Sequence, residues 1–189
     1  MCYVRLFSEF GIEFTRESFR KTYSPDWYRT YEGIGLPPER WTEADARWLA
    51  IYAEQRCGLL PSAAASLRRL KEAGLATALV TSGSRSRVER DLATLEVEGL
   101  FDAVVCSGDV EPRKPDPAPL RFALDRLRVA PSRAVYVGDS PEDVQMARAA
   151  GVRSVAIPGG FPNREALLRA GADHWAEDLI EAVELILRG

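Results

Sequence analysis

Apolar residues recur with a helical period over the first 58 residues, and no segment there has the alternation of a strand. The period predicts helices over residues 1–10, 15–23 and 42–56, the last capped by Thr42. The segment also holds many aromatic side chains, which in so small a unit more often form the core than line a substrate pocket. These are Trp27, Tyr28, Tyr31, Trp41, Trp48 and Tyr52.

After Pro61 the pattern changes to alternating helices and apolar strand segments, which is typical of β-α units with a parallel sheet. Strands are predicted over residues 76–80, 103–106, 134–137 and 152–157, with a short edge strand at His174 and Trp175. Helices are predicted over residues 62–73, 117–127, 141–150 and 177–187. Two more are predicted by their starts: one begins at Ser84 or Ser86, and one is capped by Asn163. The domain boundary is expected near residues 58–61.

The strongest local signal lies in AVYVGDSPEDVQMARAAG, residues 134–151. A buried strand breaks at Gly138, and a helix follows for which Ser140 is a good N-cap and Asp143 a capping-box acid. Asp139 therefore lies at the carboxyl end of a strand beside a helix N-terminus, where parallel sheets bind anionic ligands. From this stretch alone, a pure helix-capping role for the two aspartates is equally well supported.

Composition limits the classes of partner. The formal net charge of −3 provides no basic field for nucleic acid or for an anionic membrane. No apolar run is long enough for a membrane span or a signal segment. The cysteines are odd in number, widely spaced and without a metal-ligand pattern, so a reduced, cytoplasmic protein is expected.

Three polar residues stand at the ends of successive α/β segments. Thr81 lies in LVTSGS, Lys114 in RKPDP and Asp139 in YVGDS. A phosphoryl site needs such parts: a hydroxyl with backbone N–H groups for the oxygens, a fixed cation, and a carboxylate for a hard metal. Each motif alone is also a common turn or cap, but their order is hard to obtain by chance.

These motifs resemble those of the haloacid dehalogenase superfamily, in particular phosphoglycolate phosphatase-like enzymes with a small helical cap. VTSGS is similar to the second motif of that family, RKPDP to the third and GDSPED to the fourth. The resemblance implies a partial helical cap over residues 1–58 and a Rossmann-like α/β core over 59–189. It also implies a Mg²⁺-dependent phosphatase of small phosphorylated metabolites that works through an aspartyl-phosphate.

The same resemblance assigns roles to individual residues. Lys114 would be catalytic, holding the nucleophile and the phosphate together. Asp139 would bind Mg²⁺, and Asp143 would support the metal site. The implied phosphate-binding residues are Thr81, Ser82, Gly83 and Lys114.

The first motif of the family, a strand ending in Asp-x-Asp-Gly-Thr, has no match in these 189 residues. No aspartate precedes Asp26, and residues 24–27 indicate a turn of the cap that follows no strand. A central strand, expected between those ending at Thr81 and Asp139, would then be missing, and two strand edges would be unpaired. Either the strands close up, a neighbouring chain pairs with them, or the natural start lies upstream.

The chain in this form is expected to be inactive, because the resemblance places both catalytic acids in the missing motif. The alternative is a catalytically dead phosphate-binding or interaction module. An upstream reading frame that encodes Asp-x-Asp-Gly-Thr would favour the enzyme, and a stop codon there would favour the module. The remaining candidates are weaker: His174 is expected at the surface, and Asp109 and Glu111 on a solvated loop.

Overall fold

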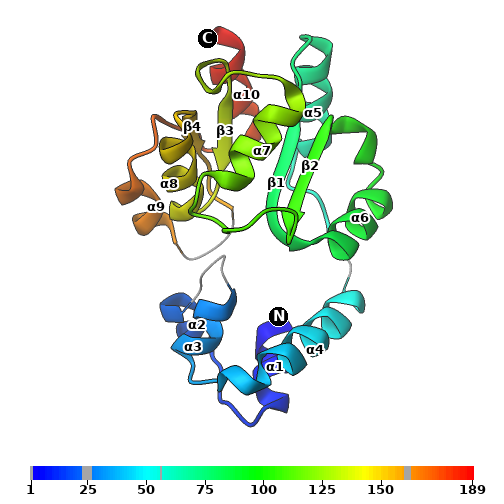
Figure 1. Cartoon of the computed structure of the whole chain (residues 1–189), viewed down its shortest axis with the longest axis vertical. Coiled ribbons are helices and arrows are strands. Elements are labelled where there is room, and N and C mark those ends of the chain that lie inside the picture. The colour runs from blue at the N-terminus through cyan, green and yellow to red at the C-terminus, as the bar shows by residue number, and fades with distance from the viewer. Residues whose placement is uncertain (1, 23–26, 56, 160–162) are drawn as a thin grey trace. The chain divides into compact units, whose positions relative to one another are not determined.

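The computed structural model describes residues 2–22, 27–55, 57–159 and 163–189, which form the compact units Met1–Cys57 and Gly58–Gly189 (Figure 1). Parts of four predicted features lie outside these described residues. They are the ends of the three predicted helices at residues 1, 23 and 56, together with residues 24–26 of the predicted turn.

The first unit is helical. It contains α1 (Cys2–Glu9), α2 (Arg16–Thr22), α3 (Trp27–Gly33), a 3₁₀ turn (Pro38–Arg40) and α4 (Trp41–Ala53). The core centres on Leu6, Phe7, Tyr31 and Ile51, and the other aromatic rings predicted to be core residues pack in or around it. The aromatic residues of this unit therefore make its core, as predicted.

Two details of this unit differ from the prediction. Helix α3 was not expected, because its short sequence WYRTYEG mixes aromatic and polar residues without a clear start signal. Thr42 does not cap α4, which begins one residue earlier. Asp45, three residues after Thr42, accepts hydrogen bonds from the hydroxyls of Tyr28 at 2.9 Å and Tyr31 at 3.1 Å.

The second unit alternates strands and helices, and all its strand pairs are parallel, which confirms the predicted α/β class. Its strands are β1 (Ala78–Ser84), β2 (Ala103–Ser107), β3 (Val135–Gly138), β4 (Arg153–Ala156) and β5 (His174–Trp175). Its helices are α5 (Ala63–Glu72), α6 (Arg85–Thr94), α7 (Ala118–Leu127), α8 (Pro141–Ala150), α9 (Arg164–Ala170) and α10 (Leu179–Arg188).

The strands form two separate sheets, β1–β2 and β3–β4–β5, and within the described residues no strand pairs β1 with β3. These are the two strands between which a missing central strand was expected. Helices bridge the division on both sides, because α7 packs on β1 and β2 and against α8, and α5 packs against α10. A core of apolar side chains that includes Val80, Val105 and Met146 joins both sheets to α7 and α8.

Side chains also cross the division at one carbonyl group. The backbone oxygen of Val80 in β1 accepts hydrogen bonds from Lys114 Nζ at 2.8 Å and from the Tyr136 hydroxyl of β3 at 3.3 Å. A buried carbonyl without a partner costs about 1–3 kcal/mol. These two side chains therefore satisfy at Val80 a group that no neighbouring strand satisfies.

Helix α8 begins as predicted, with a complete capping box. Ser140 Oγ accepts from the Asp143 N–H at 3.2 Å, and the Asp143 carboxylate accepts from the Ser140 N–H at 3.2 Å. Ser84 stands at the N-cap of α6, but its side chain makes no capping bond. Strand β1 extends four residues beyond its predicted end, so Thr81 lies inside the strand rather than after it.

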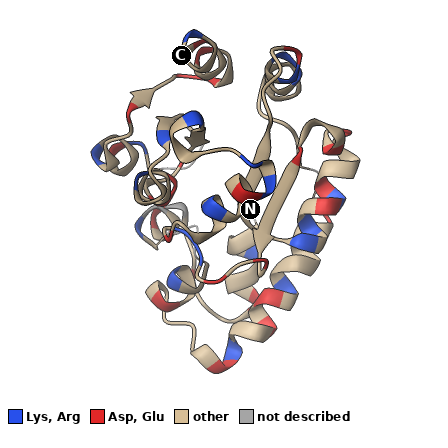
Figure 2. Cartoon of the chain, turned by 45° about the horizontal axis from the view of Figure 1, so that its top comes forward, with Lys and Arg blue, Asp and Glu red and all other residues tan. Residues whose placement is uncertain are grey.

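Basic and acidic side chains are interleaved along the helices of the chain (Figure 2). In α6, for example, Arg85 pairs with Glu89 and Arg87 with Asp91 one turn further on. No helix in the described part of the chain is long and apolar enough to cross a membrane.

We expect Ser140→Ala to lower the free energy of unfolding by about 1–2 kcal/mol, because it removes a hydroxyl that caps α8. Ser84→Ala is the matched control: it alters an N-cap serine whose buried hydroxyl has no hydrogen-bond partner among the described residues. Urea unfolding curves of the two variants should therefore differ. Equal losses would show that the capping bonds of Ser140 contribute nothing.

Candidate active site

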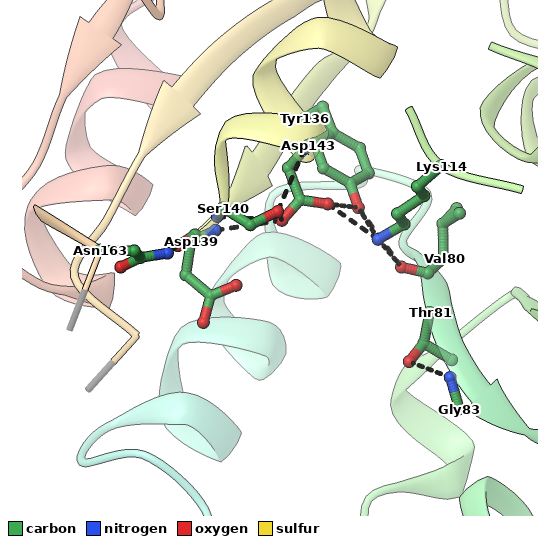
Figure 3. A network of polar contacts seen from close by, with 9 residues as sticks. All are labelled: Val80, Thr81, Gly83, Lys114, Tyr136, Asp139, Ser140, Asp143 and Asn163. Atoms are coloured by element: carbon green, nitrogen blue, oxygen red, sulfur yellow. Dashed lines mark hydrogen bonds and ion pairs between the residues drawn. The ribbon is translucent and has the colours of Figure 1, made fainter. Parts of the chain in front are cut away.

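The polar residues predicted from the three motifs meet at Thr81 within β1, at the end of β3 and in the chain before α7 (Figure 3). Lys114 and Asp143 are in direct contact, and Asp139 is joined to Asp143 through its backbone N–H at 3.3 Å. Thr81 directly follows Val80, whose carbonyl oxygen binds Lys114. The structure thus brings the predicted residues of all three motifs to one region.

Lys114 is the centre of this region. Its Nζ lies 2.8 Å from Asp143 Oδ1, 2.8 Å from the Tyr136 hydroxyl and 2.8 Å from the carbonyl oxygen of Val80. The ion pair is buried, since the side chains of Lys114 and Asp143 are only 11% and 8% exposed. A buried ammonium requires such compensation, and the pairing keeps a positive charge fixed beside the ends of both sheets.

Tyr136 belongs to this cluster, although the sequence analysis did not single it out. Its hydroxyl lies 3.0 Å from Asp143 Oδ1, and burial, with the nearby charge of Asp143, raises its pKa well above the usual range. The tyrosine therefore stays protonated and can both accept and donate a hydrogen bond. The available signal was a phenol within an otherwise aliphatic buried strand, because buried tyrosine hydroxyls usually have a partner.

The carboxylate of Asp143 is fully engaged. Oδ1 accepts from Lys114 and Tyr136, and Oδ2 accepts from the Ser140 hydroxyl at 2.9 Å and from the N–H groups of Ser140 and Asp139. The capping and functional interpretations of this residue are therefore not exclusive. The bonds that start α8 also orient the acid toward Lys114.

Asp139 has a different environment. Its carboxylate points away from the Lys114 cluster (Figure 3), and in the described part of the chain no side chain donates a hydrogen bond to it. Burial, and then the charge of Asp143, raise the pKa of Asp139. Gly159 lies so close that a Cβ atom there would stand 1.6 Å from Asp139 Oδ2, so a larger residue would displace the acid.

Asn163 corrects one prediction. It stands at the N-cap of α9, but its side chain makes no capping bond. Its amide Nδ2 donates instead to the carbonyl oxygen of Asp139 at 2.8 Å. The residue expected to start a helix therefore holds the backbone of the candidate metal ligand, a contact between distant segments that local sequence does not indicate.

The TSGS segment provides the third part of the site. The N–H of Gly83 donates to Thr81 Oγ1 at 3.1 Å, in the irregular last part of β1 where the pairing register with β2 shifts, beside the half-buried Ser82. The guanidinium of Arg87 packs against Gly83, where a Cβ atom would come within 2.0 Å of its nitrogen. A larger residue at this position would force the Arg87 guanidinium to move and would also press on Val88, whose Cγ2 atom would lie 2.9 Å from the added Cβ atom.

The weaker candidates have structural roles or lie at the surface. Asp109 is not a merely solvated loop residue, because its carboxylate accepts from Arg85 and from the N–H of Cys106 at 2.8 Å. Glu111 is exposed, and its Oε1 atom lies 3.6 Å from Nε of Arg113. His174 is exposed on β5, as predicted.

The oxygen atoms of this region fit a magnesium ion only in part. Asp139 offers a carboxylate to which no side chain donates a hydrogen bond in the described residues, and Mg²⁺ is commonly held by one or two carboxylates together with phosphate and water. Asp143 is already occupied by its own partners. No cluster of three or more acidic, histidine or cysteine side chains suited to a metal occurs in the described segments. The residues present thus fit part of such a site.

Known proteins resemble this chain over most of its length. The profile of the family described as haloacid dehalogenase-like hydrolase matches residues 1–157. Pyrophosphatase PpaX of Bacillus velezensis is 30% identical over 176 residues, which cover 92% of this chain and 81% of the relative. Phosphoglycolate phosphatase of Escherichia coli K12 is 36% identical over 121 residues, which cover 64% of this chain and 48% of the relative.

The chain thus spans about half the length of several curated relatives that it matches, 48–54%. Among solved structures, that of CbbY from Rhodobacter sphaeroides in complex with phosphate has a TM-score of 0.78 and 27% identity. The superposition covers 95% of this chain and 86% of CbbY.

The raised pKa of Asp139 has a consequence for stability. Between its unfolded pKa of about 3.9 and its higher folded pKa, the folded state retains a proton that the unfolded chain has released. The wild-type protein therefore loses stability as the pH rises through this window. We expect Asp139→Asn to be free of that loss and more stable than wild type at neutral pH, with the difference shrinking toward pH ~4.

Urea unfolding over a pH series measures this difference. Asp125→Asn removes the same charge from an exposed position of α7 and supplies the baseline. A difference between Asp139→Asn and wild type that grows as the pH falls would contradict the expectation.

Proposed function

This chain belongs to the haloacid dehalogenase-like hydrolase family, and we propose that it forms the phosphate-binding part of a phosphatase that acts on small phosphorylated metabolites. The observation that carries the proposal is the buried Lys114–Asp143 pair beside Thr81 and Asp139. A fixed cation near a hydroxyl group and a second carboxylate suits a phosphoryl group better than a neutral ligand.

In this proposal the TSGS segment and the cation both bind the phosphate. Thr81 and the backbone N–H groups of Ser82 and Gly83 bind phosphoryl oxygens, and Lys114 contributes the positive charge. Asp143 keeps the ammonium in place through their 2.8 Å contact. The phosphate bound to CbbY, a structure of the same fold, supports a phosphate ligand for this chain as well.

Asp139 would hold Mg²⁺, with Asp143 supporting the site from behind through the Asp139 N–H. When bound, the metal would neutralise phosphate charge and polarise the phosphoryl group. Gly159 and Asn163 keep the Asp139 carboxylate accessible and its backbone fixed. The site is incomplete without further oxygen ligands, which suits a metal that binds together with phosphate.

The nucleophile is not among these residues. We assign it to an Asp-x-Asp-Gly-Thr strand, which would form the aspartyl-phosphate and which the 189-residue chain does not contain. Met1–Cys57 would act as part of a helical cap. The proposed location is the cytoplasm, which the three free cysteines support. Without the nucleophile the chain is a phosphate-binding module, the alternative that the sequence left open.

We expect the 189-residue chain to show no metal-dependent hydrolysis of p-nitrophenyl phosphate above background, because Thr81, Lys114 and Asp139 can bind phosphate but cannot attack it. Fusing an upstream strand that ends in Asp-x-Asp-Gly-Thr should produce turnover. In that fusion, Lys114→Ala or Asp139→Asn should lower the rate of hydrolysis by at least about 10²-fold, because these groups act as a unit with the nucleophile.

Lys21→Ala is the control in the fusion, because Lys21 is 71% exposed and pairs with Glu17 of its own helix. This variant should keep the full rate. Hydrolysis by the unfused chain that Asp139→Asn leaves unchanged would overturn the site assignment.

We also propose that the 189-residue chain self-associates through strand edges. The facing edges of β1 and β3 have no strand partner in the described residues, and such edges pair with other chains. Sedimentation velocity over a range of concentrations should show association, which the fusion should reduce. A concentration-independent monomer would show instead that α7, α8 and the bridge at Val80 close the division.

A further inference from the structure

The ammonium group of Lys114 has no hydrogen-bond donor left for a ligand. A protonated lysine carries three N–H groups. Three protein acceptors surround Lys114 Nζ, each at 2.8 Å: the Val80 carbonyl, Asp143 Oδ1 and the Tyr136 hydroxyl. A phosphate oxygen can therefore bind this ammonium directly only by displacing one of the three.

The three acceptors differ in what their displacement would leave behind. Asp143 carries the opposite charge, so its release would separate a buried ion pair. The Val80 carbonyl can only accept, and its other hydrogen bond, from Tyr136, is long at 3.3 Å. Release of either one weakens the compensation of a buried group.

Tyr136 alone can give way without such a loss. Its hydroxyl both accepts and donates, and Asp143 Oδ1 lies 3.0 Å away as a ready acceptor for its proton. After leaving the ammonium, the phenol can remain bonded to Asp143 or to Val80. The hydroxyl oxygen also accepts a hydrogen bond from the ammonium, as a phosphate oxygen would.

We propose that the Tyr136 hydroxyl is a placeholder on Lys114, which an oxygen of a bound phosphate displaces. Tyr136 is thus a positioning residue: it holds the ammonium until phosphate binds and sets how tightly phosphate binds. This inference deepens the proposed function and rests on its phosphate site.

The chain is suited to a direct test because it has only three lysines, Lys21, Lys71 and Lys114. In ¹⁵N-lysine-labelled protein, the ammonium signal of Lys114 can be assigned by its absence from Lys114→Gln. Its protons should exchange slowly with water in the wild-type chain. They should exchange faster in Tyr136→Phe, because one N–H group loses its acceptor.

Titration with inorganic phosphate supplies the second readout. Tyr136→Phe should bind phosphate more tightly than wild type, by about two- to tenfold, because no hydrogen bond to the phenol has to be displaced. A purely structural role for Tyr136 predicts unchanged or weaker binding. Tyr28→Phe is the matched control, since it removes another hydroxyl that binds an aspartate, and it should alter neither readout.

A third readout uses the wild-type chain and does not depend on the folding of a variant. With ¹³C-labelled tyrosine rings, phosphate should shift the Tyr136 signal together with that of Lys114. A Tyr136 signal that stays unchanged would overturn the placeholder role if the Lys114 ammonium signal and, in uniformly ¹⁵N-labelled protein, the backbone N–H signal of Gly83 respond to phosphate.

The outcomes separate this inference from the proposed function. If phosphate leaves the Lys114 and Gly83 signals of the wild-type chain unchanged, the proposed phosphate site is wrong and the placeholder role falls with it. If both signals respond but Tyr136→Phe binds phosphate no more tightly, the phosphate site stands and the placeholder role alone is wrong.

Discussion

The buried pair of Lys114 and Asp143 is the interaction on which the rest of the site depends. A cation and an anion that are each about one-tenth exposed remain in a protein interior only when they are paired and hydrogen-bonded. This requirement draws together four separate segments. The loop before α7 supplies the lysine, α8 the aspartate, β1 the carbonyl of Val80 and β3 the hydroxyl of Tyr136.

The same pair connects the two sheets of the second unit. Apolar packing by α7 and α8 holds these sheets within one compact unit, but packing alone does not satisfy the backbone groups along the division. At Val80 the lysine and the tyrosine do so. The cation that we assign to phosphate binding therefore also holds the two sheets together. A change at Lys114 should affect both phosphate binding and the stability of the contact between the sheets.

The two aspartates of the fourth motif lie four residues apart and have different roles. Asp143 lies one helical turn beyond Asp139, where its oxygens receive the N–H groups at the start of α8 together with the buried cation. Asp139 remains before the helix, and Gly159 leaves room for its carboxylate. One acid is thus fixed by its partners, whereas the other keeps its oxygens available at the cost of a raised pKa.

The sequence by itself determined the helical first segment, the parallel α/β order of the second, the start of α8 and the three motifs, because periodicity, capping residues and turn residues are local signals. It also predicted the division between β1 and β3, through the family resemblance. Only the tertiary structure decided that Tyr136 completes the shell of Lys114 and that Asn163 holds Asp139 rather than a helix end. Both contacts join residues more than 20 positions apart, and one chain sequence carries no local signal for the partner that a buried polar group will find.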